Sequence, residues 1–398
     1  MPAPETPQRI EPIRVEDMPP DIADAVAELS AATATLGAAL HPRTAANLAD
    51  LVRVMNSYYS NLIEGHVTRP RDIVRALAGE LDTDKTRRNL QMEAAAHVRV
   101  QAAVDRLRCE GRLPEPASRD FLRWLHREFY GEAPAETLLI RGPDREFRME
   151  PGAWRARPEH EVAVGRHMPP ASERVEDFMR YFEERYAFAE LGKASRVLAI
   201  AAAHHRFNYI HPFPDGNGRV SRLMSHAMAH AAGIGAHGLW SISRGLARGL
   251  KSRGEYKQMM DHADMPRQGE RDGRGNLSQR ALADFTLWFL QVSLDQVRFM
   301  AELFALDTLA QRLRGYVERS ETLKPETARL LTEALIRGEL ERGEAPRIAG
   351  LPERTARRVV NDAIAHGLLA SETPKGPLSL RFPDDALDVL FPRLFPET

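Results

Sequence analysis

The stretch "FNYIHPFPDGNGRVSRLM", residues 207–224, contains residue types that could transfer a proton and hold a metal ion. His211 carries an imidazole that titrates near neutral pH and can act as a base. Asp215 carries hard oxygen atoms, which suit Mg²⁺. Pro212 and Pro214 end the preceding helical pattern near residue 210, so His211 is expected at a helix end.

The turn that follows is suited to binding an anion. Gly216, Asn217 and Gly218 tolerate the backbone angles of a tight turn, and a helical pattern begins directly after them. The N-terminus of that helix points unpaired backbone N–H groups and the positive end of its dipole at the loop. Arg219 and Arg222, three residues apart, share one helix face and can grip phosphate oxygens. These residue types predict a site that binds a polyphosphate with Mg²⁺ and deprotonates an incoming nucleophile. Either a Gly-Asn-Gly turn or a single histidine alone is usually structural, whereas their conjunction is far more specific.

The elements that position these residues are expected to be mainly α-helical. In "LADLVRVMNSYYSNLIEGH" the apolar residues form one helical face, and Gly65 stands where that helix would end. Between residues 140 and 171 Gly and Pro become frequent, and the alternating run "EVAVGRHM" predicts a small β-hairpin within the helical core. The predicted organisation is an extended arm at 1–20, N-terminal helices at 21–111, a catalytic core at 112–310 and a separate domain at 321–398.

The C-terminal domain at 321–398 has the pattern of three helices followed by two short strands. The short turn "GLPE" between the second and third helices is typical of a helix-turn-helix, and the strands with their Pro-Lys-Gly-Pro turn would form a wing. Arginines at 354, 357 and 358 begin the third helix, where they could contact DNA. A winged helix used only for protein contacts is the alternative.

Composition and charge restrict the class of protein. The chain has 398 residues, a formal net charge of -1 and 43% hydrophobic residues, which is ordinary for a globular protein without a global basic field. Its single cysteine excludes an intramolecular disulfide framework and fits a reducing cytoplasm. The N-terminus lacks the apolar run of a signal peptide, and no apolar stretch approaches the roughly 20 residues of a membrane span. We therefore expect a cytoplasmic protein with no membrane partner, whose oligomeric state, a homodimer included, stays open.

The run "HPFPDGNGRVSR" resembles the signature of the Fic family at every fixed position. The resemblance extends over the helical core, roughly residues 112–309, and includes the Gly- and Pro-rich segment where the family places a hairpin flap. It implies a helical Fic core and the transfer of AMP from ATP to a Ser, Thr or Tyr hydroxyl of a target protein. The "EVAVGRHM" hairpin resembles the flap, whose edge would align an extended target segment.

The resemblance also implies individual roles. His211 resembles the general base, and Asp215 resembles the residue that holds Mg²⁺ between the α- and β-phosphates. Arg222 resembles the arginine that pairs with the γ-phosphate. Phe213 resembles the apolar anchor of the loop. The anion nest and the first phosphate contact would come from Gly216, Asn217, Gly218 and Arg219.

A second motif, "SNLIEG" at residues 60–65, resembles the inhibitory motif that precedes the core in one class of the family. The likeness implies that Ser60 and Glu64 lie on an inhibitory helix and that Glu64 pairs with Arg222. A carboxylate there would occupy the guanidinium that ATP needs and hold the enzyme inactive.

Three alternatives accompany this interpretation. The enzyme could also remove AMP, with Glu64 positioning a water molecule. A rival from another class is a winged-helix DNA-binding regulator in which the core only senses nucleotide. A transition-metal site formed by His204, His205 and His211 with Asp215 is disfavoured, because adjacent histidines on a helix point to different faces.

Overall fold

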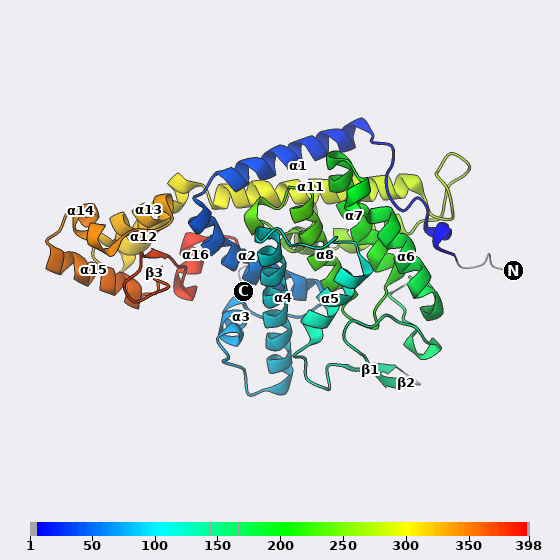
Figure 1. Ribbon diagram of the computed structural model, residues 1–398, viewed down its shortest axis with the longest axis horizontal. Coiled ribbons are helices and arrows are strands. Elements are labelled where there is room, and N and C mark those ends of the chain that lie inside the picture. The colour runs from blue at the N-terminus through cyan, green and yellow to red at the C-terminus, as the bar shows by residue number, and fades with distance from the viewer. Residues whose placement is uncertain (1–5, 143–144, 166, 396–398) are drawn as a thin grey trace. The chain divides into compact units, whose positions relative to one another are not determined.

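The computed structural model describes residues 6–142, 145–165 and 167–395, and most of these residues are helical (Figure 1). The chain divides into two compact units that are interleaved along the sequence. Three long helices, α1 (Pro20–Ala38), α2 (Pro42–Ile63) and α11 (Gln279–Leu303), contribute residues to both units. The predicted contiguous domain boundaries remain predictions. The first unit contains the residues up to Ala31, Asn56–Gly235 and Ser241–Gln296, and the second contains Ala32–Met55, Ala236–Trp240 and the residues from Val297 onward.

The centre of the first unit is the antiparallel pair α7 (Lys193–Ile210) and α8 (Asn217–Ala231) (Figure 1). Residues 197–207 of α7 are buried without interruption, and its Ala-rich sequence allows neighbouring helices to approach closely from all sides. Helix α8 packs against α7, α4, α5 and α9. The other helices of this unit are α3 (Pro70–Leu77), α4 (Lys85–Cys109), α5 (Arg119–Tyr130), α6 (Val175–Tyr186), α9 (Ile242–Arg248) and α10 (Glu255–Ala263).

Several helix ends follow from local sequence. Asp84 caps α4 by accepting a hydrogen bond from Arg87 N at 2.9 Å. Ser118 caps α5 by accepting one from Phe121 N at 3.3 Å. The predicted end of α2 is also confirmed, since the helix stops at Ile63 and Gly65 adopts a φ of 84°.

A small β-hairpin is present, but the longer pairing lies ahead of the predicted run, which itself contains one antiparallel bridge. Strand β1 (Leu139–Gly142) pairs antiparallel with β2 (Arg145–Arg148), ahead of the predicted run. Among the described residues of 161–168, pairing is limited to the single bridge between Val164 and His167, and position 166 lies outside them. Met168 and then two prolines, Pro169 and Pro170, follow His167, and because proline has no N–H donor the ladder cannot continue there.

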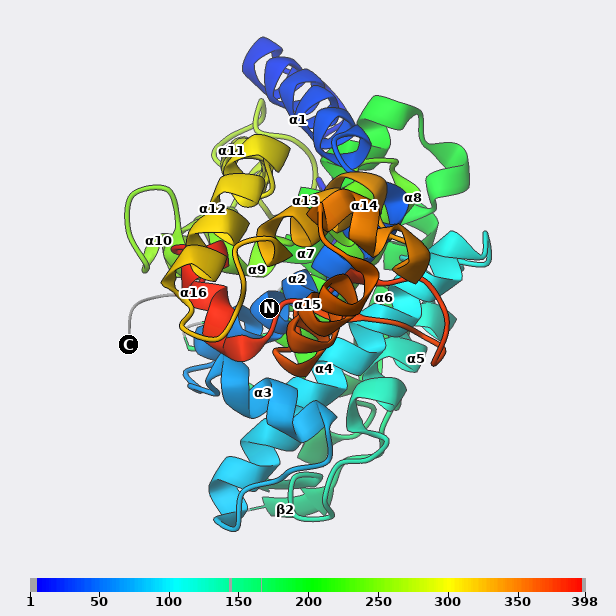
Figure 2. The same ribbon diagram turned by 90° about the vertical axis from the view of Figure 1, so that its left-hand side faces the viewer.

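The second unit contains the C-terminal helices and a second two-stranded sheet. Helices α13 (Thr327–Arg337), α14 (Ala345–Ala349) and α15 (Glu353–Ala365) pack against one another (Figure 2). Strand β3 (Leu369–Ala370) pairs antiparallel with β4 (Ser379–Leu380). This order of three helices and then a hairpin is the predicted one, while the winged-helix assignment stays a prediction. The unit also contains α12 (Leu306–Arg319) and α16 (Leu387–Leu390).

Short 3-10 helices complete the described secondary structure, and the first of them lies in the predicted N-terminal arm. They span Pro7–Ile10, Pro158–His160, Ser172–Arg174, Phe188–Glu190, Ala236–Gly238, Arg342–Glu344 and Asp384–Ala386. In the part of the chain that the structure describes, no helix is both long and apolar enough to cross a membrane.

Candidate active site

The loop between α7 and α8 is held in one conformation by the side chain of Asn217. Its Oδ1 accepts a hydrogen bond from Phe213 N at 2.9 Å, and its Nδ2 donates to Phe213 O at 2.8 Å. Phe213 is fully buried and stacks on His126, with ring centroids 3.8 Å apart. At the start of α8, Gly216 adopts a φ of 79°, which favours glycine. Asn217 therefore clamps the loop with its side chain, while its backbone belongs to the helix N-terminus.

His211 lies directly after α7 in the left-handed region, with a φ of 49°. Its Nδ1 is 3.3 Å from the carbonyl oxygen of Asn208, so an Nδ1–H donates there and the lone pair is left on Nε2. Burial lowers the pKa of His211 from 6.5 to about 4, so the ring is neutral at pH 7. The buried Arg155 fixes the backbone by donating from Nε to His211 O at 2.7 Å and from Nη2 to Ile210 O at 3.1 Å.

Asp215 is exposed at the mouth of the loop and is held by two side chains of α5. The Tyr130 hydroxyl donates to Asp215 Oδ2 at 2.8 Å, and burial raises the pKa of Tyr130 well above its usual value, so the hydroxyl keeps its proton. His126 Nδ1 accepts from Gly152 N at 2.8 Å, so its Nε2–H faces the Asp215 carbonyl oxygen at 3.2 Å. Mg²⁺ usually binds one or two protein carboxylates and takes its other ligands from phosphates and water. One hydrogen-bonded carboxylate beside a helix N-terminus matches that requirement.

Arg219 lies at the N-terminus of α8 and is buried. Its Nη2 is 2.7 Å from Glu93 Oε2 on α4, and its guanidinium lies 5.4 Å from the ring centroid of Phe129. Residues 217–219, as the first residues of α8, have no carbonyl four residues earlier within the helix, so their N–H groups face the loop. The sequence predicted Arg219 at this site but did not predict its carboxylate partner.

Arg222 is buried and is held by the two residues of the upstream motif. Its Nε donates to Ser60 Oγ at 2.9 Å, and its Nη2 donates to Glu64 Oε1 at 2.6 Å. Burial alone would raise the pKa of Glu64, but the charges of Arg222 and Arg219 lower it below 4.5, so the carboxylate is ionised at neutral pH. A Cβ on Gly218 would lie 2.5 Å from Glu64 Oε1, so the carboxylate sits directly against the N-terminal turn of α8.

The residues that sequence reasoning missed come from elements distant in the chain. Helix α4 carries polar residues at four-residue intervals, and this spacing in an Ala-rich helix was the available signal. Glu93 and Asp105 contact a row of polar side chains on α8, while Gln101 Oε1 accepts from Asn56 Nδ2 of α2 at 2.6 Å. We call the row on α4 and the row on α8 together the polar seam. The seam consists of Glu93, His97, Gln101 and Asp105 on α4 and of Arg219, Arg222, His226 and His230 on α8. Arg155, His126 and Tyr130, which support the loop, had no comparable signal.

The histidines at 204 and 205 do not join the loop residues in a metal site. His204 contacts Ser225 Oγ at 3.0 Å and the Tyr256 hydroxyl at 2.8 Å, while His205 Nε2 lies 3.2 Å from Asp264 Oδ1. The expectation that these adjacent rings point to different partners agrees with these contacts.

The central part of the chain is similar to known proteins. Residues 116–229 match the model of the Fic/DOC family. A protein adenylyltransferase Fic of Nematostella vectensis is 35% identical over 86 residues, which cover 22% of this chain and 19% of that protein. One of Aedes aegypti is 37% identical over 73 residues, covering 18% and 15%. The chain thus aligns with less than a fifth of the length of these relatives.

Two solved structures share the fold at low sequence identity. A Fic family protein from Desulfovibrio desulfuricans G20 aligns over 93% of this chain and 98% of its own, with a TM-score of 0.50 and 17% identity. A Fic domain containing signaling protein from Bacteroides thetaiotaomicron aligns over 70% and 97%, with a TM-score of 0.51 and 18% identity. At these identities the likeness concerns the fold alone.

Proposed function

We propose that this chain, whose residues 116–229 match the Fic/DOC family, is a protein adenylyltransferase that its own Glu64 holds inactive. It would transfer AMP from ATP to a Ser, Thr or Tyr hydroxyl of a target protein. The relatives named as protein adenylyltransferases support the class of reaction.

One observation carries the proposal: Ser60 and Glu64 both contact the buried guanidinium of Arg222. The Glu64 carboxylate also lies against Gly218, so it occupies the space in which a phosphate would meet the helix N-terminus. An anion already in this place excludes the γ-phosphate of ATP. The resting chain would therefore bind ATP weakly or with its α-phosphate wrongly oriented.

In the active form, His211 would accept the proton of the target hydroxyl at Nε2. The Nδ1–H contact with Asn208 O and the Arg155 contact with its backbone keep the ring oriented for this task. Bound phosphates would raise the pKa of the imidazole, because nearby negative charge stabilises the protonated ring. The hydroxyl oxygen then bonds to the α-phosphorus while the bond to the pyrophosphate oxygen breaks. Positioning and charge stabilisation by Arg219, Arg222 and the helix N-terminus supply most of the assistance.

Asp215 is the residue that would hold Mg²⁺. The Tyr130 hydroxyl fixes one of its carboxylate oxygens, and the exposed carboxylate lies at the loop mouth where phosphates would enter. When bound, Mg²⁺ neutralises charge on the phosphates and on the leaving pyrophosphate.

The test compares the wild type with Glu64→Gly and with Glu64→Gly/His211→Ala, each incubated with Mg²⁺ and ATP. Mass spectrometry of the protein and of added lysate proteins reads AMP-sized additions. We expect label with Glu64→Gly, little with the wild type and none with the double variant. Glu80→Gly is the matched control, because Glu80 is an exposed glutamate paired with an arginine, Arg75, at 3.2 Å. Label in the control equal to that in Glu64→Gly, or no label in any variant that binds ATP, would refute the proposal.

Removal of AMP by the same site is the close alternative, in which Glu64 positions the attacking water. Wild-type protein added to AMP-modified target would then release AMP, and Glu64→Gly would not. If the target keeps its AMP after incubation with the wild-type protein, the site transfers AMP but does not remove it.

A second candidate function, DNA binding by the C-terminal domain, is favoured by exposed cations. Arg354, Arg357 and Arg358 are exposed at the start of α15, and Lys375 is exposed between β3 and β4. Duplex DNA binding by the full chain should weaken in Arg354→Ala/Arg358→Ala and should fall steeply with added salt. Equal affinity for this double variant and the wild type would leave the domain as a protein-contact module.

A further inference from the structure

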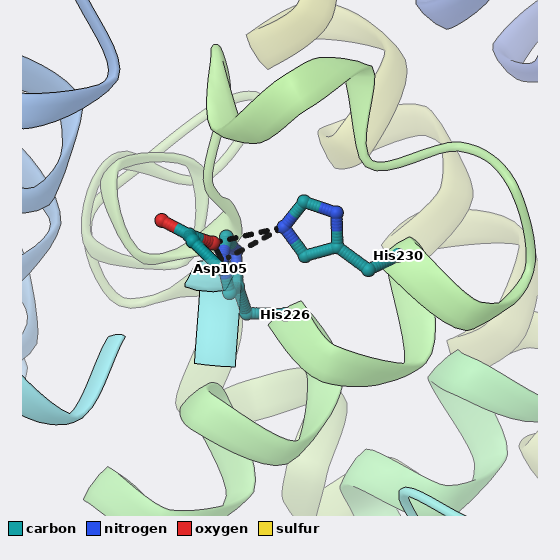
Figure 3. Close-up of side chains that lie close together, drawn as sticks. All are labelled: Asp105, His226 and His230. Carbon is teal, nitrogen blue, oxygen red and sulfur yellow. Dashed lines mark hydrogen bonds and ion pairs between the residues drawn. The ribbon is translucent and has the colours of Figure 1, made fainter. Parts of the chain in front are cut away.

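A buried cluster of Asp105, His226 and His230 lies at the far end of the polar seam from the nucleotide site. The two histidines follow Arg222 by one and two turns of α8, and Asp105 comes from α4. The Asp105 Oδ1 atom is 2.6 Å from His226 Nε2 and 3.0 Å from His230 Nε2. The two Nε2 atoms are 3.2 Å apart. Figure 3 shows both rings and the carboxylate turned toward one another.

This arrangement brings three metal-ligating atoms to one place. Histidines four residues apart on a helix point to the same side and can share one ion. In a tetrahedral zinc site with bonds of about 2.0–2.2 Å, ligand atoms are about 3.3–3.6 Å apart. The two longer separations in the cluster are within about 0.3 Å of that range, and the shortest must open by less than about 1 Å. Only small rotations of the rings and the carboxylate are therefore needed.

A comparison within the same unit distinguishes this cluster from an ordinary buried ion pair. Asp264 also lies between two histidines, but they contact different oxygens: His167 Nδ1 is 3.3 Å from Oδ2 and His205 Nε2 is 3.2 Å from Oδ1. His205 Nε2 also lies 3.0 Å from the carbonyl oxygen of Met260, which requires a donated hydrogen. That arrangement is explained by hydrogen bonds alone. At Asp105, by contrast, two ring nitrogens face the same oxygen and each other.

We propose that Asp105, His226 and His230 bind one divalent transition-metal ion, zinc by preference, that ties α8 to α4. Two imidazoles and one carboxylate favour Zn²⁺, Co²⁺ or Ni²⁺ over Mg²⁺, which selects oxygen ligands. Three protein ligands leave the fourth tetrahedral position to a water molecule. Cys109 lies one turn beyond Asp105 on α4, but it is exposed and is not part of this group of ligand atoms. Among the described residues, this is the one group of three or more His, Cys, Asp or Glu side chains with this spacing.

The role of the ion would be structural. Asp105 is just over three turns of α4 away from Glu93, and the ion would act on the helix pair rather than on the nucleotide. Because the folded chain binds the ion and the unfolded chain does not, metal binding adds to the stability of the first unit. At a free zinc concentration 100 times Kd, the gain of about 2.7 kcal/mol corresponds to a rise in Tm of about 3–5 °C.

The test uses the full chain without an affinity tag, in buffer containing excess Mg²⁺ so that Asp215 is occupied. Elemental analysis gives the zinc content, and titration with Co²⁺ reads the visible absorption of a tetrahedral site. We expect one equivalent per chain, displacement of Co²⁺ by Zn²⁺, and the rise in Tm. Asp105→Asn and His230→Gln should lose all three signals, while the matched control Asp264→Asn should keep them.

Two results would overturn the proposal. One is wild-type protein that takes up no stoichiometric Zn²⁺ or Co²⁺, in which case the cluster is a hydrogen-bonded network. The other is metal uptake that Asp105→Asn retains in full, which would mean an adventitious site elsewhere. Should Asp105→Asn fail to fold by circular dichroism, His230→Gln and the wild-type Co²⁺ spectrum decide, since within residues 6–142, 145–165 and 167–395 this cluster is the one group of ligand atoms close enough to give a tetrahedral nitrogen-containing site. None of these readouts depends on AMP transfer.

Discussion

Removal of the Glu64 carboxylate should strengthen ATP binding by an amount that the geometry allows us to estimate. Glu64 is one-third exposed (33%), and Arg222 is almost fully buried (1%), so their 2.6 Å contact is a partly desolvated, charge-assisted hydrogen bond. Such a bond is worth about 1.5–3 kcal/mol. ATP must break it before its γ-phosphate can reach the guanidinium. Since each 1.4 kcal/mol is a factor of ten, Glu64→Gly should lower the Kd for ATP by about 10- to 150-fold.

Two graded changes sharpen this prediction. Glu64→Gln keeps an oxygen that accepts from Arg222 but removes the charge. Its affinity for ATP should therefore lie between those of the wild type and Glu64→Gly. ADP lacks the γ-phosphate, so its Kd should change much less than that of ATP. Isothermal titration calorimetry with both nucleotides on the wild type, the two variants and the control Glu80→Gly measures these effects.

An equal gain in binding affinity for ADP and for ATP would refute the reasoning. That result would mean that the carboxylate repels phosphates in general instead of competing for one guanidinium. A gain that persists unchanged when Arg222→Gln is added to Glu64→Gly would refute it in the same way, because the competition requires the guanidinium.

Three further predictions concern the loop. Asn217→Ala removes two hydrogen bonds made by a buried side chain and should lower the free energy of unfolding by about 2–3 kcal/mol, measured by urea denaturation; a change below about 0.5 kcal/mol would contradict the clamp. Because the pKa of His211 is lowered to about 4, the ring stays neutral and basic above that pH. On acidification, kcat/KM for AMP transfer by Glu64→Gly should therefore fall only near pH 4. A fall near pH 6.5 would instead show an imidazole with its ordinary pKa. Tyr130→Phe removes the hydroxyl that holds Asp215 and should raise the Mg²⁺ concentration needed for half-maximal transfer about 10-fold or more, whereas an unchanged Mg²⁺ titration would assign the hydroxyl no positioning role.

The signature loop was predictable because its information is local. The prolines after position 211 and the glycines at 216 and 218 determine where one helix ends and the next begins, and the structure has α7 end at Ile210 and α8 begin at Asn217. The contact between Glu64 and Arg222 was reached differently, since it followed from resemblance to a family motif and no spacing rule relates residues so far apart.

The missed residues depend on how helices pair. Glu93 reaches Arg219, and Asp105 reaches the two histidines, only because α4 lies against α8 in one register. A single sequence gives the spacing along each helix but not the partner helix or the register. The hairpin predicted at 161–168 is limited for another reason: it forms one antiparallel bridge, and two prolines directly after it lack the donors that a longer ladder needs.

The polar seam has a consequence for how α8 can be altered. Arg222, His226 and His230 recur every fourth residue, so their partners on α2 and α4 fix the rotational angle of α8 about its own axis as well as its position. Inserting one residue between Arg222 and His226 would turn everything beyond it by about 100° and point both histidines away from Asp105. Contacts two turns away therefore help to set the angle at which the N-terminal amides of α8 face the loop.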